Sequence, residues 1–166
     1  MADSHTTEAR KKISTVHSKD TMHCLLMTLQ EIKILLPNTA VAEVIDHVSP
    51  EPVENAPDWL LGTISWRDVS VPLLSFEMIS GLGNQQQNTS GRIAVLNTLN
   101  GNPDLPYIAL LIQGIPQLRL VQEANIIVTE ADRETDLVAA SMDFFGESVL
   151  IPDLDRLEQR LLEVEM

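Results

Sequence analysis

Residues that could do chemistry are few in this chain, and their spacing does not favour a reaction. The single cysteine, Cys24, lies in an apolar run, a setting typical of a packed thiol rather than of a nucleophile. The glycine motifs of dinucleotide, phosphate and nucleophile-elbow sites do not occur. No metal-binding spacing links the four histidines, which are His5, His17, His23 and His47. The sequence therefore predicts a protein that is not an enzyme and needs no cofactor or metal ion.

Carboxylates are abundant, but their positions indicate solvated charge. Asp132, Glu134 and Asp136 lie in an acidic loop, and Asp153 and Asp155 lie at the start of an expected helix. Surface exposure is the ordinary state of such residues. A catalytic carboxylate pair requires a defined geometry, which spacing alone does not supply.

The charge is unevenly distributed, which narrows the range of partners. The whole chain carries −13; residues 1–20 hold four Lys or Arg and three Asp or Glu, a net of +1, which leaves −14 for residues 21–166. Proteins that bind nucleic acids or anionic lipids draw much of their affinity from Lys and Arg. The acidic body therefore predicts no binding of nucleic acid. We also expect no direct membrane insertion, since no apolar run approaches the roughly 18 residues of a membrane span. A protein or a small molecule is the expected partner.

Length and composition predict one domain in a reducing compartment. The 166 residues are enough for a hydrophobic core. One cysteine and the lack of an apolar leader favour a cytoplasmic location. Residues 1–20 are polar and aperiodic and are expected to form a flexible tail. The domain then occupies 21–166, and a polar, glycine-rich linker at 80–91 divides it into two subdomains.

Short strands are expected over most of the body, which favours an all-β barrel or sandwich. Two strands within Met22–Pro37 are separated at Gln30–Glu31, and a turn or two of helix is expected over Ala40–Val44. A loop or extended segment with three prolines covers 49–59. Later strands are expected at Arg92–Leu99, Tyr107–Gln113, Gln117–Val121 and Asn125–Val128. They are followed by a hairpin of Leu137–Phe145 and Glu147–Ile151.

The chain is expected to end in an amphipathic helix. Its apolar residues recur at intervals of three and four, and Asp153 is suited to be the N-cap. The expected buried face consists of Leu154, Leu157, Leu161 and Val164.

Residues 59–74 contain both tryptophans and predict a hairpin. Period-two alternation on both sides of Arg67-Asp68 places Trp66 opposite Val69 and Ile64 opposite Val71. Arg-Asp is not a preferred two-residue turn. Trp66 is more simply interpreted as core than as a contact residue, and Trp59, which follows the proline loop, less so.

Part of this region resembles the chemotaxis coupling protein family CheW. Family members carry a Val-x-Glu-Ile-like stretch, an Asn-x-Pro segment, a Gly-Val-x-Asn-Leu-Arg-Gly-like hairpin and a following Val-Pro. In this chain these elements are Val41-Ala42-Glu43-Val44, Asn55-Ala56-Pro57, Gly62-Thr63-Ile64-Ser65-Trp66-Arg67-Asp68 and Val71-Pro72. The closing segment DFFGESVLIPDLDRL is also similar to the family's last hairpin and short Asp-Leu-rich helix. The resemblance covers about residues 22–163 and is more specific in the first half.

The resemblance implies a mainly β fold of two intertwined five-stranded SH3-like β-barrels with a C-terminal helix. It also implies a non-catalytic adaptor, located at receptor arrays, that joins the cytoplasmic tip of chemoreceptors to the regulatory domain of a CheA-type histidine kinase. The family's protein-binding positions map onto Val41, Glu43, Gly62 and Arg67. We expect Glu43 and Arg67 to form a partly buried pair across neighbouring strands.

Three departures from the family pattern stand out. Asp68 occupies a family glycine position, so its turn must differ or be strained, and Trp66 replaces a leucine beside the arginine. GIPQLRL replaces the usual Asp-Ser-Val-like strand exit. The acidic body suggests a specialised coupling protein, in a system that controls pili or twitching motility.

Two other classes of function remain open at this point. A small-molecule sensor would hold its ligand in the groove between the barrels, and an enclosed pocket would favour it. An enzyme on an unrelated β fold would show convergent titratable side chains in a cleft.

Overall fold

The computed structural model describes residues 21–83, 91–122, 124, 135–144 and 146–164. The expected flexibility of residues 1–20 and the expected strand Asn125–Val128 lie outside this part. The described strands are β1 (Thr21–Thr28), β2 (Lys33–Pro37), β3 (Val41–Asp46), β4 (Leu60–Trp66), β5 (Val69–Leu74), β6 (Arg92–Asn97), β7 (Tyr107–Gln122), β8 (Val138–Phe144) and β9 (Glu147–Pro152). The helical elements are η1 (Asn38–Ala40), α2 (Phe76–Ser80) and α3 (Leu154–Leu162). The prediction of a mainly β chain with a C-terminal helix is confirmed.

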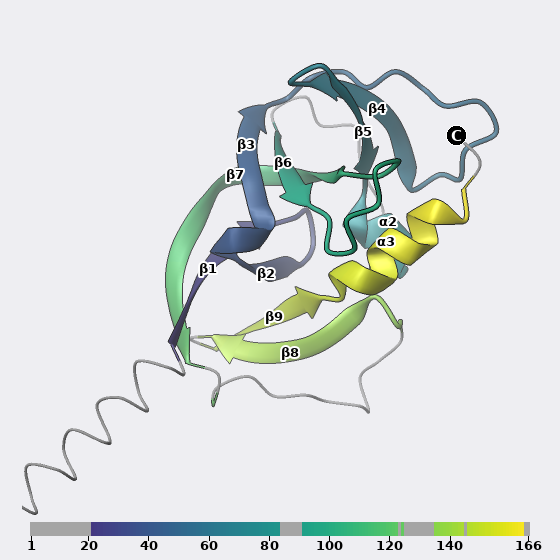
Figure 1. Cartoon of the computed structure of the whole chain (residues 1–166). Helices are drawn as coiled ribbons and strands as arrows, with labels where there is room; N and C mark the ends of the chain where they lie inside the picture. The colour runs from purple at the N-terminus through teal and green to yellow at the C-terminus, as the bar shows by residue number, and fades with distance from the viewer. Residues whose placement is uncertain (1–20, 84–90, 123, 125–134, 145, 165–166) are drawn as a thin grey trace, which may run out of the picture.

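The long strand β7 connects two groups of strands (Figure 1). Its first half pairs with β6 and, in parallel, with β5, which in turn pairs with β4. Its second half pairs with β1, which leads through β2 and β9 to β8. With β3 beside β6, each group contains five strands when β7 is counted in both. The closure of each group into a separate barrel stays a prediction.

The sequence predicted two strands where the structure has the single strand β7. The turn signals Gly114 and Pro116 fall inside it, and Gly114 has a φ of +66°. The register with β1 shifts at this point, since Thr28 is opposite Gln113 while Leu26 is opposite Gln117. Gly114 and Pro116 therefore mark a bulge and do not end the strand.

The predicted helix over Ala40–Val44 is wrong. Only the 3-10 turn η1 forms, and Val41 already begins β3. The β-branched residues Val41, Val44 and Ile45 favour an extended backbone. The antiparallel pairing with β6 adds ladder hydrogen bonds that an isolated turn of helix lacks.

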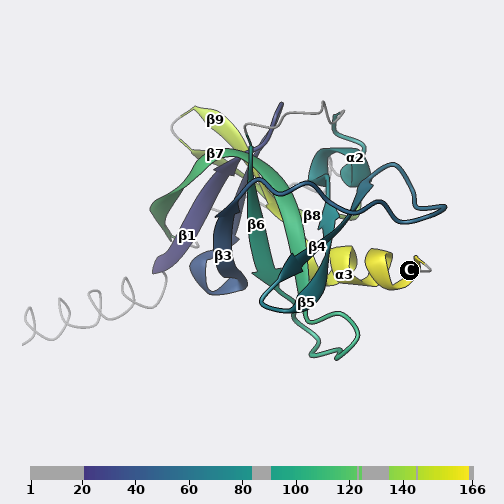
Figure 2. The ribbon, with the colours of Figure 1, turned by 90° about the horizontal axis from the view of Figure 1, so that it is seen from above.

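The C-terminal helix α3 covers one end of the main core, as its apolar spacing predicted. Leu157 and Leu161 are fully buried, and Leu154 and Val164 pack beside them. Figures 1 and 2 show α3 on the side of the molecule where α2, β4 and β5 lie.

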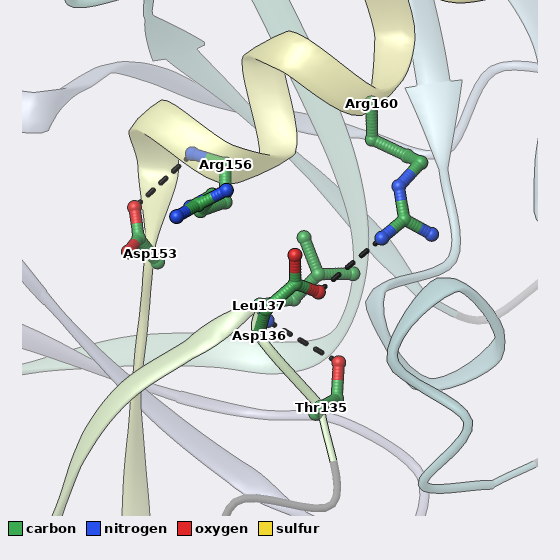
Figure 3. A network of polar contacts seen from close by, with 6 residues as sticks. All are labelled: Thr135, Asp136, Leu137, Asp153, Arg156 and Arg160. Atoms are coloured by element: carbon green, nitrogen blue, oxygen red, sulfur yellow. Dashed lines mark hydrogen bonds and ion pairs between the residues drawn. The ribbon is translucent and has the colours of Figure 1, made fainter.

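The predicted N-cap of α3 is confirmed, because the Asp153 carboxylate accepts a hydrogen bond of 3.1 Å from the Arg156 backbone N–H. Figure 3 shows this cap together with an ion pair of 3.2 Å that Arg160 makes with Asp136, just before β8.

A buried carboxylate joins α2 to the turn between β1 and β2. Glu77 is 2% exposed and accepts backbone hydrogen bonds from Gln30 (2.7 Å) and Glu31 (3.2 Å). Burial raises the pKa of Glu77; these two hydrogen bonds act in the opposite direction, and the charge of Glu31 adds to the rise. The carboxylate therefore holds a turn that the sequence marked only as a polar break.

The raised pKa of Glu77 predicts a specific pH dependence of stability. The folded chain keeps a proton on Glu77 at pH values where the unfolded chain, with an ordinary value of 4.5, has lost it. The unfolding free energy contributed by this group therefore decreases as the pH rises from 4.5 through the folded-state pKa. In Glu77→Gln we expect this decrease to vanish, so the variant gains stability relative to the natural chain across that range. Urea unfolding of both proteins between about pH 4 and 8 measures the difference, and a difference that is flat with pH contradicts the prediction.

Candidate functional site

The tip of the β4–β5 hairpin is the first element of the candidate site. The predicted register is confirmed, with Trp66 opposite Val69 and Ile64 opposite Val71. Arg67 and Asp68 form the two-residue turn with φ of +47° and +63°. Positive φ at both central residues is typical of a type I′ turn, which matches the twist of the flanking strands. The turn is thus of the usual primed kind, and its two non-glycine residues carry strain of about 1 kcal/mol each.

Trp66, next to the turn, anchors the hairpin tip in the core. It is 6% exposed and lies in the second hydrophobic cluster with Ile64 and Val71. Its ring meets Tyr107 of β7 edge-on, with 4.8 Å between centroids. The interpretation of Trp66 as core is confirmed; Trp59 is only half-buried and packs against the main cluster.

β3 and β4 are the two outer strands of this group (Figure 1), and Glu43 on β3 contacts the hairpin across the gap in backbone pairing. Its Oε2 accepts a 2.7 Å hydrogen bond from the indole Nε1 of Trp66 and lies 3.6 Å from Nη2 of Arg67. The Arg67 guanidinium carbon lies 4.6 Å from the centre of the Trp66 ring. Carboxylate, indole and guanidinium therefore form one connected unit, which we call the hairpin triad (Glu43, Trp66, Arg67).

The expected Glu43–Arg67 pair forms, but the prediction that it is partly buried across neighbouring strands is wrong. The Arg67 side chain is 70% exposed and that of Glu43 is 43% exposed. β3 and β4 are the outer strands of their group, and no backbone pairing between them occurs in the described residues. An exposed ion pair contributes about 0–1 kcal/mol. The stronger contact is the hydrogen bond from the buried indole to a charged acceptor.

The other two predicted site residues have structural surroundings. Val41 is half-buried at the start of β3 and packs against the main core. Gly62 is buried at a bulge of β4, with a φ of +143°. A Cβ built on Gly62 would lie 2.3 Å from the backbone oxygen of Glu51, which pairs with Thr63. Of the four predicted residues, the structure brings Glu43 and Arg67 together. It places Gly62 against Pro50 and Glu51 of the connection 47–59 between β3 and β4, which we call the crossing segment.

The sequence reasoning missed an apolar patch on the second half of β7. Ile115, Leu118 and Leu120 are 74%, 57% and 62% exposed; we call them the β7 patch. Leu118 and Leu120 are two residues apart and point to the same side of the sheet. The stretch GIPQLRL, which departs from the family pattern, contains all three, so the departure itself was the signal.

A groove of about 530 Å³ lies next to the patch, between β7 and β8. It is partly open to solvent and has both polar and apolar walls. The residues that line it are Arg119, Leu120, Val121, Gln122, Met142, Asp143 and Phe144.

The described residues give little support for a metal site, a reactive thiol or a membrane-spanning helix. No group of three or more His, Cys, Asp or Glu among them is arranged to hold a metal ion. Cys24 is buried, and burial raises the pKa of its thiol, which disfavours the reactive thiolate. No helix in the described ranges is long and apolar enough to cross a membrane.

Comparisons with known proteins agree with these observations. The family model described as CheW-like domain matches residues 23–161. Among solved structures, the fold is similar to that of the scaffolding protein TtCheW from Thermoanaerobacter tengcongensis, with a TM-score of 0.72 over 87% of this chain and 94% of that chain. The two sequences are 19% identical, so this likeness establishes the fold alone. No curated protein matches the chain.

The packing at Gly62 generates a prediction about stability. Gly62→Ala must displace the backbone of Glu51 and break its bridge to Thr63, because the added Cβ has no room. Gly101→Ala is the matched control, since Gly101 also has a positive φ (+63°) but nothing within 4 Å of the added Cβ. We expect the control to lose about 1 kcal/mol of unfolding free energy and Gly62→Ala to lose at least about 2 kcal/mol. Urea unfolding measures both variants. Equal losses of unfolding free energy in Gly62→Ala and Gly101→Ala would contradict the prediction, because they would show that the crossing segment accommodates the added Cβ.

Proposed function

Because the chain belongs to the CheW-like domain family, we propose that it is a non-catalytic adaptor that couples chemoreceptors to a CheA-type histidine kinase. The hairpin triad is the observation that carries this proposal. It presents an exposed cation at the tip of a hairpin whose base is fixed in the core. A side chain that is exposed and already ordered loses little entropy on binding. We assign the triad to the regulatory domain of the kinase.

The β7 patch supports a second docking surface on the same chain. Exposed aliphatic side chains that share one face suit the apolar side of a protein partner better than they suit water. The patch lies on the half of β7 that pairs with β1, whereas the triad belongs to the group around β6. Two surfaces on different groups of strands are what an adaptor needs to hold two partners at once. We assign the β7 patch to the cytoplasmic tip of the chemoreceptor.

The alternative of a small-molecule sensor finds less support. It calls for a pocket enclosed on all sides. The groove between β7 and β8 is partly open, and its lining mixes charged and apolar side chains without a buried polar centre.

Binding of the kinase regulatory domain tests the first surface. Arg67→Ala removes the exposed guanidinium and is expected to raise the dissociation constant at least tenfold, about 1.4 kcal/mol, with little change in stability. Glu43→Gln is preferred to Glu43→Ala, since the amide keeps an acceptor for the Trp66 N–H while removing the charge beside Arg67. It is expected to weaken binding by a smaller factor. Titration calorimetry measures affinity, and circular dichroism reports folding.

Arg92→Ala is the control for this experiment. Arg92 forms a comparable exposed pair with Asp46, at 2.9 Å, on the same β3–β6 ladder but outside the triad. Its replacement should leave affinity unchanged. If Arg67→Ala and Glu43→Gln bind as tightly as the natural chain, the triad is not the kinase surface.

Co-sedimentation with a chemoreceptor cytoplasmic fragment tests the second surface. The double variant Leu118→Ser, Leu120→Ser is expected to lose most receptor binding and to keep its affinity for the kinase regulatory domain. The control is Leu162→Ser on α3, a leucine of similar exposure (50%) away from β7. Normal receptor binding by the double variant, or an equal loss in the control, would remove the β7 patch from the receptor site.

A further inference from the structure

A second groove, of about 460 Å³, runs beside the hairpin tip. One wall is the outer edge of β4 with the turn residue Asp68, and the other is the crossing segment between β3 and β4. Its lining residues are Val48, Ser49, Glu51, Thr63, Ile64, Ser65, Asp68 and Ser70. The groove is therefore continuous with the tip that carries Arg67.

The groove exists because the crossing segment pairs with β4 at one point only. Glu51 and Thr63 exchange two backbone hydrogen bonds of 2.8 and 2.9 Å. The next pair in this antiparallel register would be Ser49 with Ser65, and it does not form in the described structure. Thr63 and Ser65 both turn their peptide groups away from β5, since the two-residue turn makes Trp66 and Val69 the hydrogen-bonded pair. An unpaired strand edge at Ser65 is thus left at the base of the groove.

The groove has an apolar part, with Val48 and Ile64, and a polar part that carries negative charge. Glu51 and Asp68 are both exposed, and the carboxylate of neither has a hydrogen-bond or ion-pair partner among the described residues. The adjacent cation, Arg67, lies over the Trp66 ring and beside Glu43, and no ion pair joins it to Glu51 or Asp68 among the described residues. Ser49, Thr63, Ser65 and Ser70 are the other polar residues of the lining.

We propose that this groove receives a cationic side chain, Arg or Lys, of the kinase regulatory domain and that Asp68 is the residue that selects it. The inference rests on the proposed function, because it deepens the same interface. Two carboxylates without an internal counter-charge favour a cation, and a guanidinium can donate to a carboxylate and a carbonyl together. A negatively charged side chain in the groove would be repelled by Asp68, so the contact discriminates between partners.

A charge series at one position tests this. Binding of the purified regulatory domain of the CheA-type kinase from the same organism is measured by titration calorimetry. Asp68→Asn is expected to weaken binding about 5-fold, the size of an exposed charge pair, and Asp68→Lys, which adds repulsion, more than 20-fold. The gap between the natural chain and Asp68→Asn should shrink in about 1 M salt, where exposed charges are screened.

Two control variants separate the possible causes. Asp68→Gly removes the carboxylate and relieves the positive φ, so it should fold at least as stably as the natural chain and still bind weakly. Asp104→Lys makes the same change of charge on the exposed β6–β7 connection, outside the groove, and should bind nearly normally.

The outcomes also separate this inference from the function on which it rests. If the natural chain binds the kinase domain and Arg67→Ala does not, but all Asp68 variants bind normally, the groove contact is overturned and the adaptor function stands. If Asp68→Lys and Asp104→Lys weaken binding equally, net charge and not the groove accounts for the effect, which also overturns it. If the natural chain fails to bind the kinase domain, both proposals fall together.

Discussion

The burial of the Trp66 indole is the constraint on which the group of β3, β6, β7, β5 and β4 depends. A buried indole has one polar group, its N–H, and leaving that donor without a partner would cost about 1–3 kcal/mol. The partner is Glu43, at 2.7 Å, on the far outer strand of the group. A side-chain hydrogen bond thus connects β3 and β4, two strands that no backbone ladder joins in the described residues. The face of the same ring that is left available receives the guanidinium of Arg67. The Trp66 side chain therefore links β3 to β4, which no backbone ladder joins, and positions Arg67 at the hairpin tip.

This arrangement explains how an exposed site can still be an ordered one. Arg67 lies at the tip of a hairpin, where a long side chain ordinarily samples many rotamers and pays entropy when it is immobilised. Contact with a ring that is itself packed against Tyr107 restricts that freedom in advance. The β7 patch differs, because its leucines project from a strand whose backbone is held on the β1 side. Both surfaces depend on β7, which runs through both groups, so a displacement of β7 would be felt at each.

The elements that local pattern could predict are those in which neighbours along the chain settle the outcome. The β4–β5 register follows from period-two alternation around a two-residue turn, and α3 follows from apolar spacing with an Asp cap. The failures share a physical cause, namely partners distant in sequence. Val41–Asp46 is a strand because β6, about fifty residues later, supplies its ladder. Glu77 is buried because two peptide N–H groups, 46 and 47 residues earlier, need an acceptor. The Trp66–Glu43 bond spans 23 residues, and the exposure of the β7 leucines depends on what does not cover them.

The turn at Arg67-Asp68 shows where local preference gives way to surface chemistry. Glycine would adopt the positive φ of Asp68 without strain, and the resembling family places glycine there. The strands on either side do not demand a side chain at this position, since their register and packing are complete at Trp66 and Val69. The Asp68 carboxylate makes no hydrogen bond or ion pair with the described residues that would offset the strain. We connect this cost with the contact proposed above, which lies outside the fold. The groove beside Asp68 gives that explanation a location, and its acceptors and charge define the chemistry of the group that would fill it.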